Sequence, residues 1–264
     1  MNKNLVFMMD IDIKGDGRYA SSRRAAYKYS IDSWKKWCDK NDCELFVLND
    51  LVLENDKMGI CWQRYYLFDI LDANDIQYDQ ILSVDADTIV HPDCPNFFEE
   101  SDGKYCGVSE TGCYEWVNRS LRVYEKEFFS DVKVNPWKYF NGGFQIVNEI
   151  HKEFFDVVLD FYMSNQDKLL SIQTQNGLGT DQTPINYLVT QNEIELNLLP
   201  QCYNLNQMER KNLLYLAPQH WWPDTLDNMY NSAWVYHFNG IPANPLQRGS
   251  DYFMERAYNE LNNG

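Results

Sequence analysis

Short apolar runs and longer apolar stripes alternate along the chain. Uninterrupted apolar runs are typical of buried strands, whereas apolar residues spaced three or four apart are typical of helices. The runs predict strands at residues 5–9, 44–48, 80–90, 144–147, 194–199 and 234–238. The stripes predict helices through residues 27–38, 62–71, 154–162, 185–189 and 254–261. Strands that alternate with helices predict an α/β fold in which helices flank a mainly parallel central sheet.

Three stretches show neither pattern, and we expect them to be irregular. They are residues 111–138, 164–180 and 203–233, and they contain four of the eight tryptophans. Aromatic residues make up 15% of the chain. Flat aromatic surfaces suit sugar rings, and a bulky packed core is the ordinary alternative. Loops of this composition in an α/β enzyme either form substrate walls or simply pack against the sheet.

The charge balance limits the kinds of partner. The chain has 23 Lys and Arg against 39 Asp and Glu, a net charge of −16. Phosphates would be repelled by such a surface, so we expect no nucleic-acid partner and no anionic membrane. No apolar run approaches the length of a transmembrane helix. The seven cysteines include no C-x-x-C pair and the first apolar run is too short for a secretion signal, so we expect a cytoplasmic protein with reduced thiols.

Two carboxylates two positions apart follow the apolar run at 81–84. In extended geometry alternate residues share a face, so Asp85 and Asp87 would point at one ligand. Two like charges at this distance are costly unless a cation lies beside them. Oxygen ligands of this kind suit Mg²⁺ or Mn²⁺, which also bind phosphate oxygens. The alternative is that both carboxylates only cap a loop.

Two classes of enzyme place D-x-D after an apolar strand. In phosphatases of the haloacid dehalogenase type Asp85 would be the nucleophile, and in nucleotide-sugar glycosyltransferases the pair would hold a metal on a diphosphate. The phosphatase pattern expects the motif on the first strand, whereas here it follows about the third. A non-catalytic nucleotide-sugar binder is a further alternative.

Four segments, in order, resemble the GT-A glycosyltransferases that carry D-x-D, above all families 8 and 34. They are Trp62-Gln63-Arg64 ahead of Val84-Asp85-Ala86-Asp87, then the stretch from Tyr139 to Asn148, then Asp181-Gln182, and finally His237-Phe238-Asn239-Gly240. The segment Asp16–Ala20 also resembles the entry to the first helix of family 34. The resemblance implies one GT-A domain over residues 1–264. Its nucleotide-sugar half would be about 1–100, its acceptor half about 101–240, and its C-terminal tail and helix 241–264.

The resemblance also implies which residues form the site. The metal, Mn²⁺ or Mg²⁺, would be held by Asp85, Asp87 and His237, and the catalytic pair would be Asp181 and Gln182. The nucleotide-sugar donor would be bound by Asp10, Arg18, Arg64, Asp85, Ala86, Asp87, Asn141, Gly142, Gly143 and Gly240. The Lys-Pro-Trp that follows H-x-x-G in family 8 is replaced by Ile241-Pro242-Ala243, so Arg64 or Arg248 would have to supply the positive charge.

The expected function is therefore a metal-dependent transfer of a sugar from a nucleotide-diphosphate donor. Analogy with the two families suggests UDP as the nucleotide and retention of the anomeric configuration. The aromatic loops favour a glycan or glycoconjugate hydroxyl as the acceptor.

Overall fold

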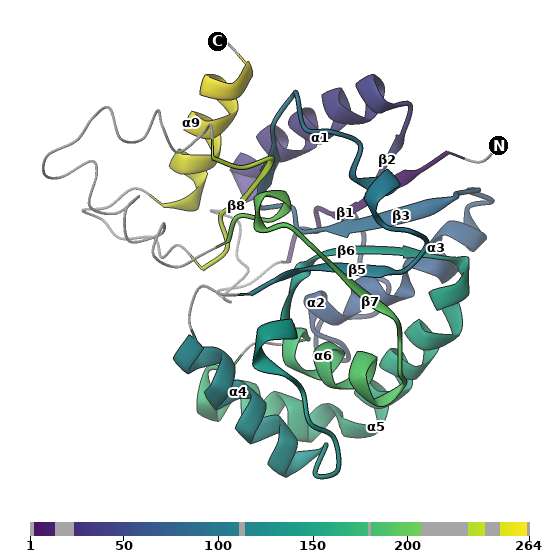
Figure 1. Ribbon diagram of the computed structural model, residues 1–264, viewed down its shortest axis with the longest axis vertical. Helices are drawn as coiled ribbons and strands as arrows, with labels where there is room; N and C mark the ends of the chain where they lie inside the picture. Colours follow the sequence, from purple (N-terminus) through teal and green to yellow (C-terminus); the bar gives the residue numbers. More distant parts are fainter. Residues whose placement is uncertain are drawn as a thin grey trace, which may run out of the picture.

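A six-stranded sheet with the strand order β2-β1-β3-β6-β5-β7 forms the centre of the computed structural model (Figure 1). The structure describes residues 3–13, 24–110, 114–178, 181–206, 232–240 and 249–262. The strands of this sheet are β1 (Leu5–Met9), β2 (Glu44–Leu48), β3 (Gln80–Val84), β5 (Tyr105–Ser109), β6 (Phe140–Asn148) and β7 (Leu196–Leu199). Only β6 runs antiparallel to its two neighbours, and the other three pairs are parallel. The predicted α/β fold with a mainly parallel central sheet is confirmed.

A separate two-stranded sheet joins two distant parts of the chain. Its strands, β4 (Thr88–Val90) and β8 (Val235–His237), pair antiparallel with Thr88 opposite His237. The prediction of one continuous strand over residues 80–90 was therefore wrong. The chain turns between β3 and β4, and the Thr88 hydroxyl closes that turn by donating to the Asp85 carbonyl at 2.7 Å. Because the residues on both sides of this turn are apolar, hydrophobicity alone does not reveal where the strand ends.

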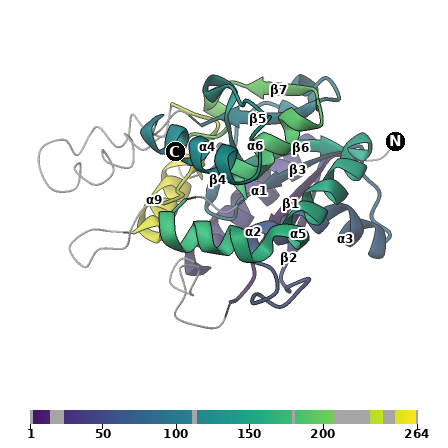
Figure 2. The ribbon, with the colours of Figure 1, turned by 90° about the horizontal axis from the view of Figure 1, so that it is seen from below.

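Helices cover both faces of the central sheet (Figures 1 and 2). They are α1 (Tyr27–Asn41), α2 (Ile60–Gln63), α3 (Leu67–Ala73), α4 (Tyr114–Glu127), α5 (Lys152–Asn176), α6 (Gln182–Gln191) and α9 (Ser250–Asn262). Short 3₁₀ turns lie at Arg24–Ala26, Arg64–Tyr66, Phe97–Glu100, Pro136–Lys138, Glu149–His151 and Gln201–Tyr203. None of the described helices is both long and apolar enough to cross a membrane.

Two large apolar clusters hold these layers together. On the α1 side, Trp34 and Trp37 are fully buried, and the Trp37 ring stacks on Phe97 with centroids 4.5 Å apart. On the other side, α3, α5 and α6 pack a second cluster in which Phe129 stacks on Tyr187 at 4.5 Å. Aromatic pairs at this distance stabilise the fold by more than the burial of their apolar surface alone. Much of the aromatic content therefore serves the ordinary packed core.

Two stretches that we expected to be irregular are helical. Residues 114–127 form α4, which buries the stripe Val117, Leu121 and Tyr124, and α5 extends to Asn176 before Gly177 ends it in a left-handed conformation (φ 59°). Both stretches contain apolar residues at helical spacing, but the polar residues between them make that periodicity weak. The strand β5 was missed because Gly107 interrupts its apolar run. The ring of Phe140 occupies the space of a Cβ there, 2.8 Å away. Within the third stretch, residues 207–231 lie outside the described part of the chain.

The register between β3 and β6 positions the site. Val84 lies opposite Phe144, and pairing continues one step further where the Asp85 amide donates to the Gly143 carbonyl at 3.0 Å. The carboxylate turn after β3 is thereby held against the glycine pair of β6. Ligands of α/β sheets bind at this edge, where the parallel strands end.

Candidate functional site

Asp85, Asp87 and His237 converge at the carboxyl end of β3. The His237 Nε2 atom lies 3.1 Å from Asp87 Oδ1 and 3.5 Å from Asp85 Oδ2. One ligand atom from each residue lies within 4.8 Å of the others. Pairing of β8 with β4 delivers the histidine, and the Phe238 amide anchors the turn by donating to the Asp87 carbonyl at 2.8 Å. The three residues predicted as metal ligands are thus brought together, although the carboxylates meet across a turn and not along an extended strand.

The donor set fits a divalent cation. In the described part of the chain the His237 Nε2 atom is buried and has no hydrogen-bond partner of acceptable geometry. Two carboxylate oxygens and one imidazole nitrogen suit Mn²⁺ and Mg²⁺, and the nitrogen shifts the preference toward Mn²⁺. The space beside the cluster is kept open by Gly143, where a Cβ would lie 2.4 Å from Asp85 Oδ2 and 2.6 Å from His237 Cε1. Only glycine is tolerated at this position while the three side chains keep their places.

Asn204 fixes the orientation of the histidine ring. Its amide nitrogen donates to Asn141 Oδ1 at 3.0 Å, which leaves its oxygen to accept from His237 Nδ1 at 3.0 Å. A proton on Nδ1 leaves the Nε2 lone pair of the neutral ring facing the carboxylates. A second hydrogen bond of this kind is what ligating histidines have in metal sites. The sequence analysis missed Asn204, since a lone asparagine beyond a strand carries no pattern that would single it out.

Charges in the cluster move two pKa values in opposite directions. Burial lowers the pKa of His237, but the carboxylates of Asp87 and Asp85 outweigh it and raise that pKa to about 9. Burial raises the pKa of Asp85, but Arg64 and His237 outweigh it and hold the pKa well below its usual range. Without a metal the imidazole is therefore protonated at neutral pH, and this proton supplies the positive charge that the carboxylates need.

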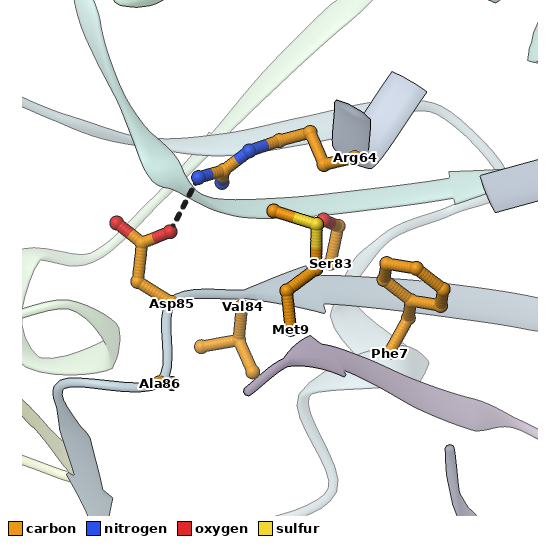
Figure 3. Close-up of a pocket in the computed structure, with 7 residues that line it drawn as sticks. All are labelled: Phe7, Met9, Arg64, Ser83, Val84, Asp85 and Ala86. Carbon is orange, nitrogen blue, oxygen red and sulfur yellow. Dashed lines mark hydrogen bonds and ion pairs between the residues drawn. The ribbon is translucent and has the colours of Figure 1, made fainter. Parts of the chain in front are cut away.

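Arg64 connects the carboxylate turn to the start of α6. Its guanidinium donates to Asp85 Oδ1 at 2.6 Å and to the Gly142 carbonyl at 2.7 Å, and its Nε lies 3.5 Å from Asp181 Oδ2. Figure 3 shows the Arg64 side chain pointing at Asp85 from above β3. Only 7% of the side chain is exposed. Arg64 was predicted to bind the nucleotide sugar, but its N–H groups donate hydrogen bonds to acceptors within the protein.

Asp181 and Gln182, the predicted catalytic pair, open α6. The Asp181 side chain is buried, and it makes no capping hydrogen bond to α6 in the described chain. Its Oδ2 accepts from the Tyr65 hydroxyl at 3.2 Å and also faces Arg64. Gln182 Oε1 accepts from the Gly142 amide at 3.2 Å. The two residues are thus held by groups that also hold the carboxylate turn.

A second carboxylate lies beside this pair. Asn141, which is buried, donates through Nδ2 to both Gln182 Oε1 and Glu110 Oε2 at 3.0 Å. Glu110 Oε2 also accepts from Asn206 at 2.9 Å. Glu110 and Asn206 were not predicted. Glu110 follows β5, and because that strand was missed, nothing marked the residue after it as lying at the ligand-binding edge.

The remaining predicted residues are distributed more widely. Asp10 follows β1 and pairs with Arg24 at 2.7 Å, apart from the cluster. A small cavity of about 30 Å³ lies at the ends of β1 and β3 (Figure 3) and is lined by Phe7, Met9, Arg64, Ser83, Val84, Asp85 and Ala86. Gly240 adopts a left-handed conformation with φ 62°. Arg18 and Arg248 lie outside the described residues.

The contrast between the two neighbouring glycines gives the first prediction. A Cβ at position 143 would enter the ligand cluster, whereas at Gly142 the nearest atom, Gln182 Cβ, would lie at an ordinary 3.5 Å. Gly143→Ala should weaken Mn²⁺ binding at least tenfold, and Gly142→Ala should change it much less. Calorimetric titration of both variants with Mn²⁺ measures this. Equal affinities for Gly143→Ala and the unaltered protein would show that the cation binds elsewhere.

The second prediction concerns how the affinity for Mn²⁺ depends on pH. Since the pKa of His237 is about 9 without metal, a cation that binds Nε2 must displace a proton at any lower pH. Mn²⁺ affinity should therefore rise about tenfold per pH unit from pH 6.5 to 8.5 and level off above about 9. Calorimetry in two buffers of different ionisation enthalpy should count about one proton released at pH 7.5. His237→Ala should bind more weakly and with a flatter pH profile, and a flat profile in the unaltered protein would exclude His237 as a ligand.

Comparison with known proteins supports the fold. No protein-family model matches the chain, and no curated sequence matches it either. Among solved structures it is similar to a glycosyltransferase involved in glycosylation of the major capsid of PBCV-1, with 12% identity, TM-score 0.57 and coverage of 96% of this chain and 99% of that one. It is also similar to the galactosyltransferase LgtC in complex with donor and acceptor sugar analogs, with 13% identity, TM-score 0.50 and coverage of 98% and 95%. The chain therefore has the GT-A fold, as the sequence motifs suggested.

Proposed function

We propose that this protein is a metal-dependent glycosyltransferase that moves a sugar from a nucleotide-diphosphate donor to a hydroxyl of a glycan or glycoconjugate. The observation that carries the proposal is the convergence of Asp85, Asp87 and the buried Nε2 of His237 at the strand ends of a GT-A fold. The phosphatase alternative is less well supported, because it requires the motif on the first strand and Asp85 follows the third.

The charge of the chain supports a role for metal in donor binding. A donor diphosphate approaching a protein of net charge −16 is repelled unless a cation neutralises it locally. The described arginine nearest the carboxylate turn, Arg64, is already engaged with Asp85 and Asp181. In this proposal Asp85, Asp87 and His237 hold Mn²⁺ or Mg²⁺, which supplies positive charge to the diphosphate leaving group. UDP is the nucleotide we favour, from the resemblance to families 8 and 34.

The side chains around the cluster supply the remaining functions. Gly142 and Gly143 let the backbone approach the donor, and Asn141 and Gln182 hold this glycine pair in place through hydrogen bonds to its amides. Asp181 lies behind Arg64, where a carboxylate stabilises positive charge that develops on the sugar in the transition state. Arg64 lies between Asp181 and Asp85 and holds the pKa of Asp85 below its usual range. Asp10, Ala86 and Gly240 complete the proposed donor site, with residues 1–100 mainly binding the nucleotide and residues 101–240 the acceptor.

A ligand panel tests the proposal. Thermal shifts should be measured with UDP-, GDP- and dTDP-sugars, each with and without Mn²⁺. A ligand at 100 times its dissociation constant stabilises the folded protein by about 2.7 kcal/mol. Stabilisation that requires both Mn²⁺ and a nucleotide sugar is the expected result. Stabilisation by vanadate or beryllium fluoride with Mg²⁺, but not by any nucleotide sugar, would favour the phosphatase and overturn the proposal.

The role of Asp181 separates an enzyme from a non-catalytic binder. Asp181→Asn removes the charge but keeps the shape, so nucleotide-sugar affinity should change by only a few fold while turnover falls at least tenfold. The matched control is Asp160→Asn, on the exposed side of α5, which should leave both unchanged. Release of UDP from UDP-sugar measures turnover. Unchanged turnover in Asp181→Asn would remove this residue from the mechanism, and nucleotide-sugar binding without turnover in the unaltered protein would favour the binder.

A further inference from the structure

Two exposed aromatic side chains stack on one another near the site. Trp137 is 70% exposed and Tyr114 is 57% exposed, and their ring centroids lie 5.6 Å apart with an interplanar angle of 27°. Among the large hydrophobic residues that are exposed in the described chain, these two are the aromatic ones. Such a pair offers a flat, partly apolar face on which a ligand ring can stack.

The backbone holds this pair in place. The Asn135 side chain accepts from the Trp137 amide at 3.0 Å, and Pro136 occupies the first position of the same 3₁₀ turn. Tyr114 is the first residue of α4, and its carbonyl accepts from the Asn118 side chain at 2.8 Å. A preformed aromatic surface loses little conformational entropy when a ligand covers it. The pair therefore has the rigidity of a binding surface.

The pair also lies next to the proposed catalytic residues. The Glu110 amide donates to the Tyr139 carbonyl at 2.8 Å, so the chain leaving β5 and the chain entering β6 run side by side there. Trp137 precedes Tyr139 by two residues, which places its Cα within about 7 Å of that of Tyr139. Figure 1 shows α4, which begins with Tyr114, lying beyond the end of β5. The backbone thus links Trp137, through Tyr139, to Glu110, which in turn hydrogen-bonds Asn141.

The surroundings determine which ligand fits. In the chain Glu115 follows Tyr114 and Lys138 follows Trp137, and the net charge is −16, so an anionic lipid surface is disfavoured. Glu110 accepts hydrogen bonds from Asn141 and Asn206, and the buried Asn206 Oδ1 has no hydrogen-bond partner in the described chain. An uncharged ligand with one apolar face and many hydroxyls satisfies both kinds of surface.

We infer that Trp137 and Tyr114 form the stacking platform for the acceptor saccharide. This inference rests on the proposed function, because it assigns the acceptor side of the same site. A sugar ring on the platform directs its hydroxyls toward Glu110 and Asn206. The chemical class of the acceptor is then a neutral saccharide of at least two rings, one to stack on the aromatic pair and one to reach the catalytic residues.

The test compares saccharide binding by variants that keep the donor site intact. The protein with UDP and Mn²⁺ is applied to a printed array of neutral mono- to tetrasaccharides, and the strongest saccharide is then titrated by NMR. Trp137→Ala should weaken its binding at least tenfold, and Trp137→Tyr, which retains a flat ring, should restore most of the affinity. Ile150→Ala is the matched control, since Ile150 is 77% exposed but lies beyond the opposite end of β6. UDP affinity should be equal in all variants.

The possible results distinguish failure of the aromatic platform from failure of the proposed transferase function. Equal saccharide affinity in Trp137→Ala and the unaltered protein would overturn the platform and leave the transferase proposal standing. The platform also fails if the unaltered protein binds UDP but no neutral saccharide, or if Trp137→Ala loses binding to phosphatidylcholine vesicles instead. If no protein binds UDP, GDP or dTDP in the presence of Mn²⁺, the proposed function itself is overturned.

Discussion

The site depends on one buried positive charge. Arg64 is almost inaccessible to water, and its guanidinium lies between the carboxylates of Asp85 and Asp181. A buried ion that loses every partner is strongly destabilising, but Arg64 is shared by two carboxylates and keeps one when the other is replaced, so the three residues form one connected group. They come from the turn before α3, the turn after β3 and the start of α6. The fold must bring these three places together, and the ion pairs in turn hold the proposed metal site at a fixed distance from the proposed catalytic carboxylate.

The same argument about charge explains the histidine. Two of the carboxylates, Asp85 and Asp87, face His237, and a single guanidinium does not neutralise both. Without metal, a proton on the imidazole compensates the excess negative charge, as the raised pKa of His237 indicates. A divalent cation delivers more positive charge to the same place and needs the neutral ring. In the proposed site, metal and proton therefore compete for the same imidazole nitrogen.

What the sequence revealed about the site was local, and what it concealed was contact between distant segments. Asp85, Asp87, Asp181 and His237 stand beside strands or at a helix start, where apolar patterns mark the ends of elements. The turn that separates β3 from β4 was not visible, because both strands are apolar. Asn204, Glu110 and Asn206 were missed for another reason. Each gains its place from a partner 30 to 100 residues away, such as His237 for Asn204 and Asn141 for Glu110, and no spacing within one segment reports such a contact.

The antiparallel strand β6 makes this arrangement possible. In a wholly parallel sheet, only residues that follow strands lie at the ligand-binding edge. Because β6 runs against β3 and β5, its first residues, Asn141 to Gly143, lie at that edge and carry the glycine pair to the carboxylate turn. The segment that precedes β6 is brought to the same edge, and Trp137 with it. One reversal of strand direction thus brings the glycine pair and Trp137, which lie on the same stretch of chain, to the ligand-binding edge.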